Sequence, residues 1–283
     1  MTRNLFYHAS CPDGFGAAWA ARRAWGDTAR YLPIGHDERL DVGSVDGGIA
    51  IFADICPRND DLRRLGEVAA QLVVLDHHVT ARDRVGAEPG LQNQLEAEGH
   101  LIHFDLTRSG AMLAWRYFHG GAEPPALLRY VEDQDLWAWA LSSSEEFNAA
   151  LGSFALDFER WDELAERPVE ELVREGAPIL RANRIEVARA LAHAHPILLD
   201  ERRIEVVNAQ RLRSQIGHEL ASRASYGRPW GAVYRLVADR VDVSIYSIGE
   251  LDVGSLAQRY GGGGHRNAAG FTLPLKDWLA LLL

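Results

Sequence analysis

The chain has 283 residues, of which 47% are hydrophobic and 25% charged, with a net charge of −10 and two cysteines. This length can hold two domains with separate cores, and no apolar stretch is long enough to span a bilayer. No Lys/Arg-rich stripe stands out that could follow a long nucleic acid, so the acidic balance favours short substrates.

Three apolar segments each end at residues that can bind a metal ion. Such runs are typical of buried strands in a parallel sheet, and ligand sites of these sheets lie beyond the carboxyl ends of the strands. A single acid after a strand is usually a helix N-cap, but three strands that converge on His and Asp favour a metal site. Residues 5–7 are followed by His8 and Asp13, residues 49–53 by Asp54, and residues 72–75 by Asp76, His77 and His78.

A fourth acidic contribution comes from residues 130–137. Acids near a helix end are usually solvated, but the apolar residues of this segment indicate that one side is buried. We therefore expect one acid to point inward, with Asp133 favoured as a ligand and Asp135 as the alternative.

Between these segments, residues 107–111 precede a helical stretch at 112–118. Hydroxyl and backbone N–H groups at a helix start can hold an anion, which makes Ser109 and Gly110 candidate substrate contacts. The simpler alternative is that Ser109 only caps the helix.

Residues 168–195 carry apolar side chains at roughly helical spacing, and Pro196 should end that helix. We therefore place a helical linker at 167–198 between domains at 1–166 and 199–283. The second domain alternates predicted strands (204–207, 232–237 and 241–248) with predicted helices (215–224 and 253–260).

Four successive glycines, Gly261 to Gly264, are followed by His265 and Arg266. Glycines allow close backbone approach and can aim several N–H groups at one anion. The run alone would indicate a flexible loop. Beside His265 and Arg266, it favours a phosphate-binding loop that includes Gly262, Gly263 and Gly264.

Taken in order, these residues resemble the four motifs of the DHH phosphoesterase superfamily, and residues 261–270 resemble the signature of its DHH-associated C-terminal domain. The opening segment 6–15 is most similar to the nanoRNase B branch of oligoribonucleases. The resemblance implies an α/β fold, in which a doubly wound, mostly parallel sheet is joined by a helical linker to a smaller α/β domain, with a cleft between them.

The resemblance also implies one or two Mn²⁺ ions, although other divalent ions suit such ligands. Asp54 would bridge the ions, Asp76 would orient His77, and His78 would donate to the phosphate or leaving group. The implied metal ligands are His8, Asp13, Asp54, His77 and Asp133.

Cys11 departs from the family pattern, because many relatives carry an aspartate at this position. It is either a soft metal ligand or, as we favour, a small thiol that packs in a turn. Both cysteines, Cys11 and Cys56, lie beside proposed ligands, which favours a reducing cytoplasm over a structural disulfide.

The function that follows is metal-dependent hydrolysis of short oligonucleotides to mononucleotides by a cytoplasmic enzyme, with a homodimer left open. Alternatives within the same chemistry are hydrolysis of cyclic mononucleotides, of linear or cyclic dinucleotides, or of 3′-phosphoadenosine phosphate. An alternative from a different functional class is a nucleotide-binding sensor that has lost turnover because Cys11 prevents binding of two metal ions.

Overall fold

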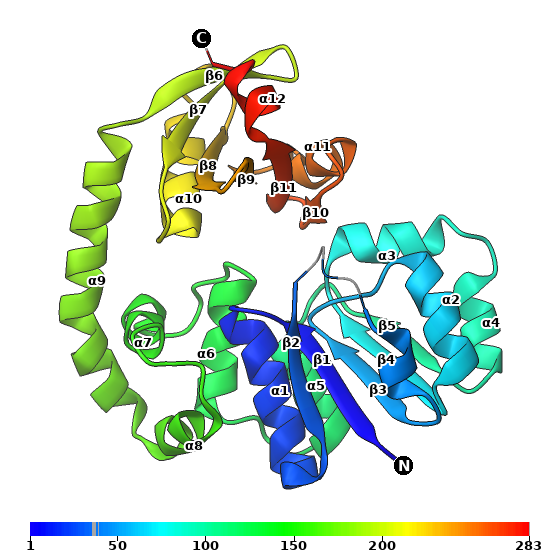
Figure 1. The fold of residues 1–283 in the computed structure, drawn as a ribbon. Helices are drawn as coiled ribbons and strands as arrows, with labels where there is room; N and C mark the ends of the chain where they lie inside the picture. Colours follow the sequence, from blue (N-terminus) through cyan, green and yellow to red (C-terminus); the bar gives the residue numbers. More distant parts are fainter. Residues whose placement is uncertain (36–37, 39, 283) are drawn as a thin grey trace. The chain divides into compact units, whose positions relative to one another are not determined.

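A computed structural model describes residues 1–35, 38 and 40–282 and divides the chain into two compact units, residues 1–180 and 181–283 (Figure 1). Each unit has its own sheet and its own apolar core. Within the described residues, no helix is long and apolar enough to cross a membrane.

The first unit is built on a five-stranded sheet in the order β2-β1-β3-β4-β5, and every strand pair in it is parallel. The parallel α/β sheet predicted from the sequence is therefore confirmed. Because the strands are parallel, their carboxyl ends share one edge. The strands are β1 (Arg3–His8), β2 (Arg30–Ile34), β3 (Ile49–Ala53), β4 (Gln71–Asp76) and β5 (Leu101–Phe104).

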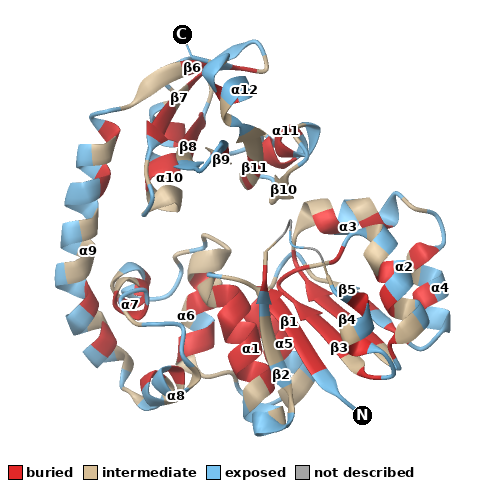
Figure 2. Cartoon of the chain, viewed as in Figure 1, coloured by how far each residue is buried: buried red, intermediate tan, exposed pale blue. Residues whose placement is uncertain are grey.

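Helices cover both faces of this sheet, which is why β1, β3 and β4 are buried along nearly their whole length (Figure 2). Successive residues alternate between two cores: Ile51 and Val73 pack on one face, and Phe52 and Val74 on the other. Helices α1 (Pro12–Trp25), α5 (Gly110–His119), α6 (Ala126–Asp135), α7 (Ser144–Leu151) and α8 (Phe158–Glu166) contribute to the first core, and α2 (Asn59–Val68), α3 (Val79–Gly86) and α4 (Leu91–Ala97) to the second.

The long helix α9 (Val169–Leu191) occupies most of the segment predicted as a linker. The division between the two units falls inside this helix, after Leu180, whereas the sequence analysis placed boundaries on either side of it. The helix ends before Pro196, which lies in the strand β6 (His195–Leu199) instead.

The second unit contains a six-stranded sheet in the order β10-β11-β9-β8-β7-β6. All its strand pairs are antiparallel except β7–β8, which is parallel and joined through α10 (Arg213–Arg223). The predicted strands and helices of this region are present with slightly different ends. The remaining elements are β7 (Arg202–Asn208), β8 (Trp230–Val237), β9 (Arg240–Ser247), α11 (Val253–Arg259), β10 (Gly263–Gly264), β11 (Ala268–Pro274) and α12 (Leu275–Leu279).

Candidate metal centre

Asp54 lies at the centre of a cluster of carboxylates and imidazoles at the carboxyl edge of the first sheet. Its Oδ1 lies 3.0 Å from His77 Nε2, and its Oδ2 lies 3.5 Å from His8 Nδ1. The side chain is buried, and its backbone has a φ of +60°, a left-handed conformation that non-glycine residues rarely adopt. Backbone strain of this kind is concentrated at functional sites.

Asp13 enters the cluster from the first turn of α1 and is held by the start of α5. Its Oδ2 accepts a hydrogen bond from the Gly110 amide at 2.6 Å, and its Oδ1 accepts one from the Ala111 amide at 3.0 Å. A Cβ on Gly110 would lie 2.4 Å from the Asp54 Cβ. Only glycine therefore allows the start of α5 to approach both carboxylates closely.

Asp135, and not Asp133, completes this group from the end of α6. Asp135 Oδ2 lies 3.5 Å from His77 Nε2, and Asp13 Oδ2 lies 3.6 Å from the same nitrogen. The carboxylate of Asp133 instead accepts hydrogen bonds from the amides of Ala140 and Leu141. This geometry favours Asp135, the alternative, over Asp133 as the ligand.

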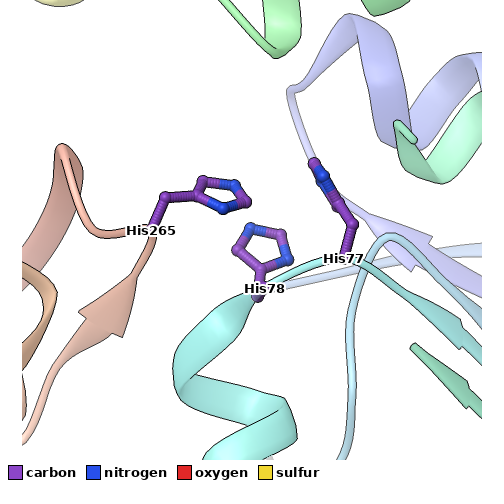
Figure 3. Close-up of side chains that lie close together, drawn as sticks. All are labelled: His77, His78 and His265. Atoms are coloured by element: carbon purple, nitrogen blue, oxygen red, sulfur yellow. The ribbon is translucent and has the colours of Figure 1, made fainter. Parts of the chain in front are cut away.

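The chain leaves β4 through Asp76 and enters α3 through His77 and His78, both labelled in Figure 3. Asp76 Oδ1 accepts a hydrogen bond from the His77 amide at 2.8 Å and lies 2.7 Å from His78 Nδ1. The prediction that Asp76 orients the His77 ring is therefore wrong, because the carboxylate orients His78. A carboxylate just before a helix start can bind the nearest amides and a ring two residues away.

Opposing charges set the protonation states in this cluster. Burial alone would raise the pKa of Asp54, but the hydrogen bond from His77 and the nearby His8 ring hold it well below its usual range. Burial alone would lower the pKa of His77, but its hydrogen bond to Asp54 and the charges of Asp135 and Asp13 raise it to about 10. Burial and the charge of Asp54 raise the pKa of Asp135 to about 6, although His77 opposes the shift.

The donor atoms fit a divalent cation. Groups of three, each with its donor atoms within 4.8 Å of one another, are formed by His8, Cys11 and Asp54 and by Asp13, His77 and Asp135. Asp54 Oδ2 and Asp135 Oδ2 are buried and accept no hydrogen bond from the described residues. A buried carboxylate oxygen without a donor is costly unless a cation offsets its charge. The structure thus brings together the predicted residues His8, Asp13, Asp54 and His77.

The predicted substrate contacts at the start of α5 have other partners. Ser109 is fully buried, and its hydroxyl accepts a hydrogen bond from the Met112 amide as the N-cap of α5. The Gly110 amide is bound to Asp13. Both residues therefore position the cluster, and neither presents its polar group as a substrate contact would.

In the second unit, the glycine run packs against its own sheet. Gly263 and Gly264 pair with β11, and a Cβ on Gly262 would lie 1.9 Å from the Gly270 carbonyl oxygen. Arg266 forms an ion pair with Glu250, and both side chains are more than half exposed. Exposed pairs of this kind contribute little stability, so Arg266 can exchange Glu250 for another anion.

Two substitutions on α6 test the assignment of Asp135. We expect Asp133→Asn to lower the free energy of unfolding by roughly 1–3 kcal/mol, because one of two loop amides loses its acceptor. We expect Asp135→Asn to leave the metal-free protein at least as stable, since it removes a carboxylate that burial makes costly to ionise.

Thermal unfolding with and without Mn²⁺ measures both effects. The increase in unfolding temperature caused by the ion should persist in Asp133→Asn and decrease in Asp135→Asn. The reverse pattern would restore Asp133 as the ligand.

Comparisons with known proteins agree with this architecture. Residues 207–283 match the DHHA1 domain. An uncharacterized protein, R106, of Acanthamoeba polyphaga mimivirus is 26% identical over 289 residues, which cover 94% of this chain but only 66% of that protein.

Two solved structures are similar along nearly the whole chain. RecJ in complex with Mn²⁺ from Thermus thermophilus has a TM-score of 0.51 and 17% identity, with 99% of this chain and 50% of RecJ covered. A pGpG-specific phosphodiesterase, PggH from Vibrio cholerae, has a TM-score of 0.47 and 14% identity, with 99% and 96% covered. The second unit thus matches the DHHA1 domain over residues 207–283, and the fold of the chain is similar to that of RecJ.

Proposed function

We propose that this protein is a metal-dependent phosphodiesterase that hydrolyses short oligonucleotides to mononucleotides. The observation that carries the proposal is the position of Asp54, which directs one carboxylate oxygen toward His77 and the other toward His8. A carboxylate placed in this way could bind one ion through each oxygen, with His77 beside one ion and His8 beside the other. The similarity in fold to RecJ, whose structure contains Mn²⁺, also supports a divalent ion.

Two sets of residues would hold the ions. His8 and Asp54, with Cys11 beside them, form one set, and the other consists of Asp13, His77 and Asp135. Bound Mn²⁺ would supply an activated water and would neutralise the charge that builds on the phosphate. Carboxylate and imidazole donors suit this ion and other first-row divalent ions.

His78 is placed to act as a proton donor. Burial alone would lower the pKa of His78, but the charge of Asp76 and the contact with its carboxylate raise it. Asp76 holds Nδ1 of the ring at 2.7 Å, so the ring has a fixed orientation. A protonated imidazole held in this way can donate to a phosphate oxygen or to the leaving oxygen of the ester.

The charge of the chain is distributed unequally, in a way that fits a small anionic substrate. Residues 181–283 contain 14 Lys and Arg against 10 Asp and Glu, a net charge of +4, whereas residues 1–180 contain 16 against 30, a net charge of −14. The acidic unit carries the proposed cation ligands, and cations would offset part of its charge. We assign substrate phosphate binding to the basic unit, at His265 and Arg266.

A nucleotide sensor without turnover is the competing function. A binding protein has no need of a strained, buried Asp54 whose Oδ2 accepts no hydrogen bond among the described residues. The same chemistry accommodates cyclic nucleotides, linear or cyclic dinucleotides and 3′-phosphoadenosine phosphate, so the assay has to include them.

The direct test is hydrolysis of labelled di- to pentanucleotides, longer RNA, and these alternative substrates by the purified protein with Mn²⁺. We expect the highest rates on the short oligonucleotides and no turnover after chelation. Asp54→Asn should reduce the rate by roughly 100-fold or more, because it removes the charge of the carboxylate that lies between His8 of one set and His77 of the other.

Asp105→Asn is the matched control, because Asp105 follows β5 at the same edge of the sheet but accepts its hydrogen bonds from Thr107. Its rate should match the original protein. Unchanged turnover in Asp54→Asn would contradict the mechanism, and tight nucleotide binding without turnover would favour the sensor.

Metal binding should release protons, and its affinity should rise with pH. Since the pKa of His77 is raised to about 10, the folded protein gains stability from protonated His77 below pH 6.5 and loses it as the pH rises toward 10. A cation must displace that proton, so we expect release of about one proton near pH 7.5 for the ion that binds His77.

Titration calorimetry with Mn²⁺ in buffers of different ionisation enthalpy measures this number. Proton uptake, or an affinity that falls between pH 6 and 8, would contradict the assignment of His77 as a ligand.

A further inference from the structure

Cys11 lies at the start of α1, just after the turn that follows β1. Cys11 is the N-cap residue of α1, but its side chain makes no capping hydrogen bond. Ser, Thr, Asp and Asn are the residues that cap helices well, and cysteine is not among them. The Gly14 amide lies close enough to act on the Cys11 sulfur, and a sulfur that accepts a hydrogen bond can still bind a metal ion.

The surroundings of the Cys11 sulfur also differ from those of a thiol packed only among apolar side chains. The sulfur of Cys11 lies within 4.8 Å of donor atoms of His8 and Asp54. A small apolar side chain gains little in a polar, negatively charged setting. These polar neighbours favour a role for the thiol in the cluster over the expected packing in a turn.

The local backbone brings Cys11 next to His8. Ser10 has a φ of +57°, which turns the chain just after β1. A Cβ on Gly14 would lie 2.3 Å from the His8 carbonyl oxygen, so glycine at this position lets the first turn of α1 fold back onto the end of β1. His8 and Cys11 thereby both lie near the carboxylate of Asp54, and His8 Nδ1 lies nearest to its Oδ2.

This oxygen is the second, independent sign of a ligand. Asp54 is 1% exposed, and its Oδ2 accepts no hydrogen bond from the described residues. The donor atoms of His8, Cys11 and Asp54 lie within 4.8 Å of one another, and His8 Nδ1 lies 3.5 Å from Asp54 Oδ2. Nitrogen and oxygen donors on one tetrahedral ion are about 3.4 Å apart, given their usual bond lengths.

We propose that Cys11 is a metal ligand, and that the site it forms with His8 and Asp54 selects a thiophilic ion such as Zn²⁺ over Mn²⁺. Thiolate is a soft ligand that favours zinc, whereas the Asp13, His77 and Asp135 set offers only oxygen and nitrogen. The two halves of the centre therefore differ in metal preference. This inference rests on the metal centre of the proposed function and adds a specificity to it.

The test is titration of the metal-free, full-length protein with Cd²⁺ and Co²⁺, which report sulfur ligation through thiolate-to-metal charge-transfer absorption. We expect one thiolate per protein to bind. The band should be absent in Cys11→Ser and retained in Cys56→Ser, because the Cys56 sulfur donates to the Pro57 carbonyl oxygen instead. Thermal unfolding without metal checks that each variant is folded.

A second variant tests metal preference through a change in relative affinity and not through a loss of binding. Cys11→Asp supplies a hard ligand at the same position, so the ratio of Zn²⁺ to Mn²⁺ affinity should fall at least about tenfold. An unchanged ratio would overturn the inference.

The spectra also separate this inference from the proposed function. If Cd²⁺ raises the unfolding temperature of the original protein without a charge-transfer band, the centre binds metal but Cys11 is not a ligand. If neither Cd²⁺, Co²⁺ nor Mn²⁺ binds, the metal centre itself is wrong. A band that survives in Cys11→Ser would overturn the assignment of the cysteine.

Discussion

Repulsion between buried carboxylates is the constraint on which this site depends. Asp13 and Asp54 are 1% exposed and lie with Asp135 around a single imidazole nitrogen of His77. Like charges gathered away from water are costly, and protonated His77 offsets only part of that cost. A bound divalent cation would offset the remainder. The buried carboxylates that destabilise the metal-free fold would therefore give the protein its affinity for metal.

The rest of the first unit keeps these groups together. Parallel strands place His8, Asp54 and Asp76 at one edge, and apolar cores on both faces prevent the strands from shifting. The start of α5 then binds Asp13 through two amides, at a distance that Gly110 alone permits. Packing energy far from the site thus maintains the left-handed backbone at Asp54.

The positions of His8, Asp54 and His77 could be predicted, because three apolar strands each end at His or Asp and parallel strands share one carboxyl edge. The choice between Asp133 and Asp135 was not predictable in the same way. Residues two apart on a helix point about 200° apart, so only the packing of α6 decides which one faces the cluster. The contact of Asp76 with His78 was not predicted. It depends on the side-chain rotamers of the two residues, which the sequence pattern does not determine. The close packing of the glycine run could not be predicted either, because it depends on pairing with β11.

Anomalous scattering from crystals grown with Mn²⁺ tests the central claim most directly. We predict an anomalous peak within bonding distance of a carboxylate oxygen of Asp54, with His8 or His77 as a neighbouring ligand. A protein saturated with Mn²⁺ whose anomalous peaks all lie away from Asp54 would contradict this account.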